Sequence, residues 1–238
     1  MGRARVLVVS RLNKSRGEPI LCYVTDRRIL PVENPADVSE TLLRKVEEVA
    51  AEGIDWIQIR EKDLSGKDCA ALTKGALRRA AKAAAGEANS ARILINDRLD
   101  IAVSEDAGGV HLGEHSLPVT EARRLAVSRG PGKDFLIGVS CHSLEAAKAA
   151  EREEADYIFF GPVFATPSKA AYGAPQGVAR LAEVCRSVSL PVLAIGGVTL
   201  ENAASCLAAG AAGIAAIRLF QDAQDIKSLV QAIRKPKR

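Results

Sequence analysis

Residues 190–217, LPVLAIGGVTLENAASCLAAGAAGIAAI, contain one complete strand–helix–strand unit. Two short apolar runs, LPVLAI and GIAAI, flank an alanine- and leucine-rich stretch, Leu200–Ala209, that is typical of a helix. Thr199 is suited to cap the start of this helix, and Gly210 is suited to the left-handed position after its end. The runs are apolar throughout rather than alternating, which indicates strands that are covered on both faces and paired in parallel.

The same unit repeats from residue 20 to the end of the chain. Eight apolar runs begin near Ile20, Ile54, Arg92, Gly108, Phe135, Asp156, Leu190 and Gly213. Helices are expected over Ala36–Glu52, Ser65–Ala85, Arg98–Asp106, Pro118–Ser128, Ser143–Glu154, Val178–Ser187, Leu200–Ala209 and Ile226–Arg234. Eight units favour closure into an α/β fold, a single-domain (β/α)8 TIM barrel. An open doubly wound sheet is the rival, but no Gly-x-Gly-x-x-Gly motif follows the first run.

Composition sets the class of protein. The 238 residues carry 33 Lys+Arg against 29 Asp+Glu and are 47% hydrophobic, as in an ordinary soluble globular protein. No apolar run is long enough to span a membrane, and five scattered cysteines without a C-x-x-C pair favour neither disulfides nor structural zinc. We expect a cytoplasmic protein that binds neither nucleic acid nor membranes, with a mobile basic N-terminal extension at residues 1–19 and a barrel domain at residues 20–238.

Polar side chains follow the second apolar run, where the carboxyl end of a barrel strand would meet a ligand. The alternation of a strand points Gln58, Arg60 and Lys62 to one side and Glu61 to the other. Three donors, two of them cationic, indicate an anionic ligand. The alternative is an internal ion pair of Arg60 or Lys62 with Glu61 or Asp63.

Asn96 and Asp97 follow the third run. A carboxylate there is suited to Mg²⁺, which prefers oxygen and usually takes only one or two carboxylates when phosphates supply the other ligands. An Asp that opens a helix is more often an N-cap, so both interpretations of Asp97 stay open.

The segment Gly161–Lys169 follows the sixth run and is rich in hydroxyl groups, glycine and proline, as expected of an active-site loop. Its residues Thr166, Ser168 and Lys169 combine hydroxyl donors with a positive charge, which predicts a phosphate site.

The last two runs end in Gly196-Gly197 and Ile217-Arg218. The loops after the last two strands are the usual phosphate site of this fold, because paired glycines let backbone N–H groups approach the anion.

The histidines differ in their surroundings. His111 lies inside an apparent strand and is expected to be a hydrogen-bonded core residue, whereas His115 fits either environment. His142 follows Ser140 at a strand end, where an imidazole that faces the cavity would suit proton transfer. Alternation turns Cys141 away from both neighbours and disfavours a nucleophilic thiol.

Seven segments in unbroken order between residues 20 and 222 resemble thiamine-phosphate synthase and its relative, the thiazole tautomerase TenI. They are Tyr23–Asp26, Gln58–Lys62, Ile95–Arg98, Gly109–Gly113, Gly138–Ser143, Gly161–Phe164 with Thr166–Lys169, and Ala194–Gly197.

The resemblance implies that a hydroxymethylpyrimidine diphosphate and a hydroxyethylthiazole phosphate are joined to thiamine phosphate with the help of Mg²⁺. It implies that the pyrimidine diphosphate is bound by Gln58, Arg60, Lys62, Asn96 and Lys169, and the metal by Asp97. It implies a thiazole-phosphate pocket formed by Thr166, Ser168, Gly197, Ile217 and Arg218, and it makes Lys62, Lys169, His142 and Ser140 the candidate catalytic residues, with Ser140 also contacting substrate. The family also suggests a homodimer.

Two positions depart from the synthase pattern. Ser116 stands where the family has a second magnesium carboxylate, and Arg218 stands where it has a small hydroxylic residue. Tautomerases, however, often lack the residues seen here as Asp97 and Lys62. Synthase activity is therefore the leading hypothesis. The alternatives are a tautomerase that aromatises a carboxythiazole phosphate, with His142 moving the proton, and a non-catalytic thiazole-phosphate-binding paralogue.

Overall fold

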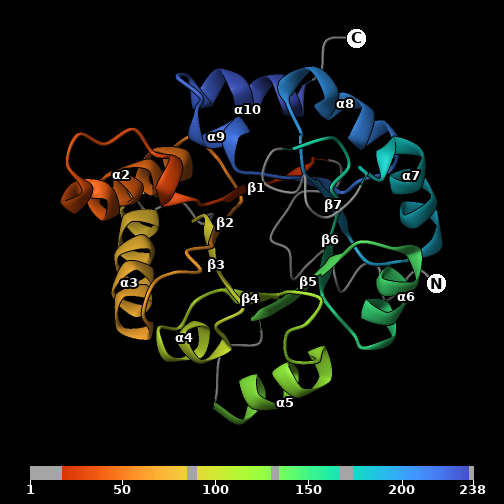
Figure 1. Cartoon of the computed structure of the whole chain (residues 1–238), viewed down its shortest axis with the longest axis horizontal. Helices are drawn as coiled ribbons and strands as arrows, with labels where there is room; N and C mark the ends of the chain where they lie inside the picture. The colour runs from red at the N-terminus through yellow and green to blue at the C-terminus, as the bar shows by residue number, and fades with distance from the viewer. Residues whose placement is uncertain (1–17, 85–89, 130–133, 167–173, 236–238) are drawn as a thin grey trace.

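The computed structural model describes residues 18–84, 90–129, 134–166 and 174–235, and its eight parallel strands close into a barrel. Each strand pairs with the next in chain order, and β8 pairs back with β1. The strands are β1 (Ile20–Val24), β2 (Trp56–Ile59), β3 (Arg92–Asn96), β4 (Gly109–Leu112), β5 (Leu136–Cys141), β6 (Tyr157–Phe160), β7 (Val192–Ile195) and β8 (Gly213–Ala216). The predicted TIM barrel is confirmed, and Figure 1 shows the helices arranged around the ring of strands.

Helices occupy the stretches between strands. They are η1 (Arg27–Ile29), η2 (Pro35–Asp37), α2 (Val38–Ala51), α3 (Gly66–Ala83), α4 (Leu99–Ser104), α5 (Val119–Arg129), α6 (Leu144–Arg152), α7 (Gly177–Ser187), α8 (Leu200–Ala208), α9 (Arg218–Gln221) and α10 (Ile226–Arg234). Each expected helix is present, with α10 at the predicted bounds. The sequence did not predict α9, because a four-residue helix is too short to show a helical period.

Side-chain caps fix several helix starts. Ser65 accepts a hydrogen bond from the backbone N of Asp68 at 3.1 Å, and Ser143 accepts one from Ala146 at 3.0 Å, as their sequence positions predicted. At α8 the backbone N of Thr199 donates to Oδ1 of Asn202 at 2.8 Å. These caps set where each chain segment turns away from the carboxyl end of its strand.

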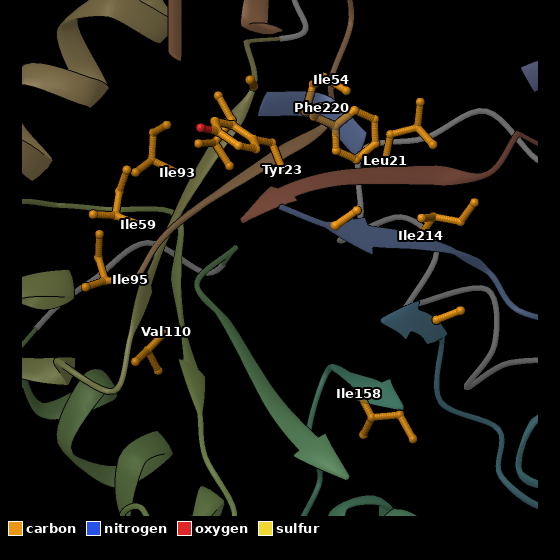
Figure 2. Packing of buried hydrophobic residues seen from close by; sticks show 14 of the residues in the cluster. Leu21, Tyr23, Ile54, Ile59, Ile93, Ile95, Val110, Ile158, Ile214 and Phe220 are labelled. Atoms are coloured by element: carbon orange, nitrogen blue, oxygen red, sulfur yellow. The ribbon is translucent and has the colours of Figure 1, made fainter. Parts of the chain in front are cut away.

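Two apolar layers result from the alternation along each strand. Odd-numbered residues of β1, such as Leu21 and Tyr23, pack outward against the helices, and Figure 2 shows this outer layer. Even-numbered residues such as Cys22 pack into the barrel interior with Trp56, Leu94, Tyr157, Phe159 and other side chains. The interior is therefore a packed core beneath the mouth of the barrel. Burial of each large apolar side chain there stabilises the fold by about 1.5–3 kcal/mol.

The predicted N-terminal extension lies outside the described residues, except for Glu18 and Pro19. None of the described helices has the length and apolar character needed to cross a membrane. All five cysteines are free thiols; Cys185 is half-buried and the other four are buried.

Candidate active site

A hydrogen-bonded row of side chains crosses from β2 to β3 at the carboxyl end of the barrel. Gln58 is buried and donates from Nε2 to Oδ1 of Asn96 at 3.1 Å. Asn96 in turn donates from Nδ2 to Oδ2 of Asp97 at 2.9 Å. The structure therefore brings these three predicted site residues together.

Asp97 is the exposed end of this row, and its backbone is in the left-handed region with φ of 60°. Its backbone N donates to the carbonyl O of His111 at 2.9 Å, and its Oδ1 accepts from the backbone N of Gly113 at 2.9 Å and from the Ser116 hydroxyl. The N-cap of α4 is Arg98, without a side-chain capping bond. The interpretation of Asp97 as an N-cap is therefore wrong, and its left-handed turn directs the carboxylate to the loop after β4.

The surroundings of Asp97 favour its charged form. Partial burial opposes ionisation, but hydrogen bonds from Ser116 and Gly113 and the charge of Lys62 outweigh it and lower the pKa of Asp97 below its ordinary value. Asp97 is thus a carboxylate at neutral pH, and the positive charge of Lys62 acts on it.

The alternative of an internal ion pair for Arg60 or Lys62 is wrong, because another residue binds both carboxylates. The guanidinium Nη1 of Arg27 lies 3.0 Å from Oε2 of Glu61 and 2.8 Å from Oδ1 of Asp63. Within the described ranges, the structure gives Glu61 and Asp63 no ion pair with either Arg60 or Lys62. Arg60 is half-buried and Lys62 is exposed at the mouth.

A second polar row crosses β4, β5 and β6. The imidazole of His111 is 2% exposed and bonds the Ser140 hydroxyl through Nε2 at 2.9 Å and the Tyr157 hydroxyl through Nδ1 at 3.1 Å. The ring also lies 4.0 Å, centroid to centroid, from Phe159. The prediction of a hydrogen-bonded core histidine is confirmed, and His111 fixes the side chain of the candidate residue Ser140.

The adjacent residues Cys141 and His142, at the end of β5, have different surroundings. His142 is half-buried, and its Nδ1 bonds the carbonyl O of Gly161, which fixes the ring. Cys141 packs instead in the helix-facing layer, where burial, with a smaller effect from the charge of Glu114, raises the pKa of its thiol to about 12. The expectation that Cys141 is not a nucleophile is consistent with this environment. His115 is exposed.

The end of β7 requires glycine. Gly196 and Gly197 have φ of 92° and 65°, and a Cβ on Gly197 would lie 2.5 Å from the carbonyl O of Ala165. The backbone N of Phe164 donates to the carbonyl O of Gly196 at 2.9 Å, so this turn packs directly against the loop after β6. Thr166, in that loop, is half-buried, whereas Ser168 and Lys169 lie outside the described residues.

Ile217 and Arg218 follow β8 at the start of α9. The Arg218 side chain is 63% exposed, and its Nη1 lies 3.8 Å from Oδ2 of Asp222. The predicted contact of Arg218 with a phosphate stays a prediction. Gln221, at the other end of α9, accepts from the Tyr23 hydroxyl at 2.8 Å and donates to the carbonyl O of Asp26 at 3.0 Å, which fixes α9 beside β1.

Sequence reasoning missed Thr25, Arg27 and Gln221 as supports of the site. Thr25 and Arg27 follow β1, which neighbours β2 in the barrel. The sequence could have indicated these supports, because the first two strands of the predicted barrel are parallel neighbours. The loops that follow two such strands must lie side by side.

Comparison with known proteins places the chain in a family. The family model described as thiamine monophosphate synthase matches residues 29–220. A putative thiamine-phosphate synthase of Geobacter sulfurreducens is 47% identical over 74% of this chain and 78% of its own length. A thiamine-phosphate synthase of Roseiflexus castenholzii is 37% identical over 91% of this chain and 87% of its own length.

A solved structure agrees with these relatives. The thiamine phosphate pyrophosphorylase from Pyrococcus furiosus is 30% identical and superposes with a TM-score of 0.73, covering 90% of this chain and 94% of that one. The resemblance carried by the seven segments is confirmed. The chain belongs to the thiamine monophosphate synthase family.

Proposed function

We propose that this protein is a thiamine-phosphate synthase, a transferase that joins hydroxymethylpyrimidine diphosphate and hydroxyethylthiazole phosphate into thiamine phosphate and releases pyrophosphate. The observation that carries the proposal is the ionised Asp97 carboxylate under the influence of Lys62, at the end of the row from Gln58 through Asn96. Relatives that bear this name across most of the chain support the same activity.

The proposed reaction requires no covalent bond between substrate and protein. Departure of pyrophosphate leaves a benzylic-type pyrimidine cation, which the thiazole nitrogen attacks without a protein nucleophile. The chain must therefore neutralise negative charge on the leaving group and orient the two substrates. We assign the first task to Arg60, Lys62 and Lys169.

The residues fit a magnesium ion at Asp97. Its carboxylate is ionised and exposed, and Mg²⁺ commonly needs only one or two carboxylates where phosphate oxygens complete the shell. The described ranges contain no group of three His, Cys, Asp or Glu side chains suited to a metal, and diphosphate oxygens and water would supply the further ligands. When bound, the ion would offset the charge that grows on the departing diphosphate.

The remaining assignments concern the acceptor side and the environment. His111 orients the Ser140 side chain, and the carbonyl of Gly161 orients the His142 ring. Both Ser140 and His142 would contact the reacting substrates. We assign the thiazole phosphate to Thr166, Ser168, Gly197, Ile217 and Arg218. The proposal includes a cytoplasmic location and, by analogy with the family, a homodimer.

Turnover tests the proposal. Purified protein with both substrates and Mg²⁺ should form thiamine phosphate and pyrophosphate in equal amounts, and Asp97→Asn should remove most of this activity. Asp100→Asn is the matched control, because Asp100 is an exposed carboxylate three residues away whose two oxygens accept hydrogen bonds from Arg98. Absence of product with enzyme in excess over substrate would reject the synthase.

A second activity, the aromatisation of a carboxythiazole phosphate, is favoured by one observation. Ser116 meets Asp97 with a hydroxyl rather than a second carboxylate, as suits a site for one phosphate. This reaction would run without metal and would be lost in His142→Asn. Full retention of tautomerase activity in that variant would contradict the assignment.

A further inference from the structure

Side chains of the loop after β2 alternate between two sides that have different neighbours. Its even-numbered residues include Arg60 and Lys62, which we assign to the diphosphate. Its odd-numbered residues Glu61 and Asp63 face the loop after β1, where they meet Thr25 and Arg27. We call these four residues, Thr25, Arg27, Glu61 and Asp63, the Arg27 cluster.

Thr25 joins the two loops through one buried hydroxyl. It is 0% exposed, and its Oγ1 donates to Oε1 of Glu61 at 2.6 Å and accepts from the backbone N of Arg60 at 3.0 Å. Its own backbone N donates to the carbonyl O of Gln58 at 2.9 Å. The hydroxyl therefore extends the β1–β2 pairing to the residue that carries the first cationic side chain of the site.

Arg27 binds both carboxylates. Its backbone N donates to both oxygens of Glu61 at 3.1 and 3.2 Å, and its guanidinium donates to Oε2 of Glu61 at 3.0 Å and to both oxygens of Asp63 at 2.8 Å. The side chain of Glu61 is only 1% exposed, and a charge buried to that extent requires such partners.

The electrostatic consequence concerns the neighbouring cations. Glu61 and Asp63 lie directly beside Lys62 in sequence and would compete with an anionic ligand for Lys62 and Arg60 if they were unpaired. The hydrogen bond with Arg27 lowers the pKa of Asp63, as expected of a carboxylate already bound to a cation.

We propose that Thr25 and Arg27 are positioning residues for the diphosphate: Thr25 sets the backbone of Arg60, and Arg27 keeps Glu61 and Asp63 from neutralising Arg60 and Lys62. This inference rests on the proposed function of the site, and it adds two residues to that site that touch no substrate.

Thr25 is tested by two substitutions of similar size. Thr25→Val removes the hydroxyl with little change in shape and should weaken binding of pyrophosphate with Mg²⁺, measured by calorimetry, by about 5- to 10-fold, as for one lost hydrogen bond that bridges two groups. The KM for the pyrimidine diphosphate should rise with it, while kcat changes less. Thr25→Ser keeps the hydroxyl and should stay within about twofold of wild type.

A single and a double variant test the role of Arg27 through the loss and recovery of pyrophosphate affinity. Arg27→Gln should weaken pyrophosphate binding about tenfold, with a smaller loss at high salt, because the released carboxylates then compete for the site cations. Asp63→Asn added to Arg27→Gln should recover part of the affinity. A merely structural contact predicts no recovery when a second member of the cluster is removed.

The outcomes separate this inference from the proposed function. Equal pyrophosphate affinity in wild type, Thr25→Val and Arg27→Gln overturns the inference alone, as does an equal loss in Thr25→Ser and Thr25→Val. Wild-type protein that neither binds pyrophosphate nor forms product overturns both. If Thr25→Val fails to fold, the comparison of Arg27→Gln with the double variant decides, and no recovery in the double variant rejects the inference.

Discussion

The hydroxyl of Ser116 donates a hydrogen bond to Oδ1 of Asp97, so a neutral side chain faces the carboxylate at the mouth of the barrel. The same hydroxyl oxygen accepts from the backbone N of Gly113 at 2.8 Å. By resemblance, Ser116 stands where a second magnesium carboxylate is expected in the synthase family. In this chain the residue therefore orients Asp97 and adds no negative charge of its own.

Replacement of Ser116 tests what the hydroxyl does. Ser116→Asp adds a charge beside Asp97 and should tighten Mg²⁺ binding in the absence of diphosphate by about tenfold, which corresponds to ~1.4 kcal/mol. Ser116→Ala is the control and should change this affinity less than about threefold, because one neutral donor is lost. Calorimetric titration with Mg²⁺ measures both, and an Asp variant no tighter than the Ala variant would place the metal elsewhere.

Removal of Lys62 tests the cationic side of the site. Lys62→Ala should weaken binding of the pyrimidine diphosphate by about 1.5–3 kcal/mol, because a charge-assisted contact is lost. Lys74→Ala, at an exposed position on α3, is the charge-matched control and should leave the affinity unchanged. A dissociation constant that does not move in Lys62→Ala contradicts the assignment of this residue.

The charge state of Asp97 gives a pH dependence with a defined sign. Although partial burial opposes ionisation, the bonds from Ser116 and Gly113 lower the pKa of Asp97 in the folded chain. Ionised Asp97 therefore stabilises the fold above the ordinary Asp pKa of about 3.9, and this stabilisation is lost as the pH falls further, through the folded value. Carbon-detected NMR titration should show the Asp97 carboxyl titrating below about pH 3.9, and higher in Ser116→Ala. A midpoint above 3.9 in the wild type would refute this interpretation of the site.

The polar row of His111, Ser140 and Tyr157 requires glycine at position 138. A Cβ at this position would lie 2.1 Å from Cζ of Tyr157, whose hydroxyl bonds His111. Gly138→Ala should destabilise the protein by about 1–3 kcal/mol through overpacking, measured by urea denaturation. In Gly66→Ala, the control, the added Cβ meets only the end of the Arg98 side chain at 3.0 Å, which can move. Equal stability of the two variants would show that Tyr157 has room to move.

The sequence predicted the barrel because the fold depends on a repeated local pattern, the apolar run followed by a capped helix. The expectation that Gln58, Arg60 and Lys62 share a side also rests on a local pattern, the alternation along a strand. The sequence did not predict the contacts of Arg27 with Glu61 and Asp63, because they join residues far apart in the chain whose charges suited several pairings.

The pairing of Ser116 with Asp97 shows the same limit. The resemblance to the synthase family identified Ser116 as a departure from the family pattern. Its hydrogen bond depends on the left-handed backbone of Asp97 and on the turn at Gly113, neither of which follows from a periodic pattern.

A crystal structure with Mg²⁺ and pyrophosphate tests the central claim most directly, since the claim concerns which residues meet at one ligand. We predict a diphosphate in contact with Arg60 and Lys62, and a metal ion with Asp97 among its ligands. A diphosphate bound away from Arg60 and Lys62, or a metal without Asp97 among its ligands, would contradict it.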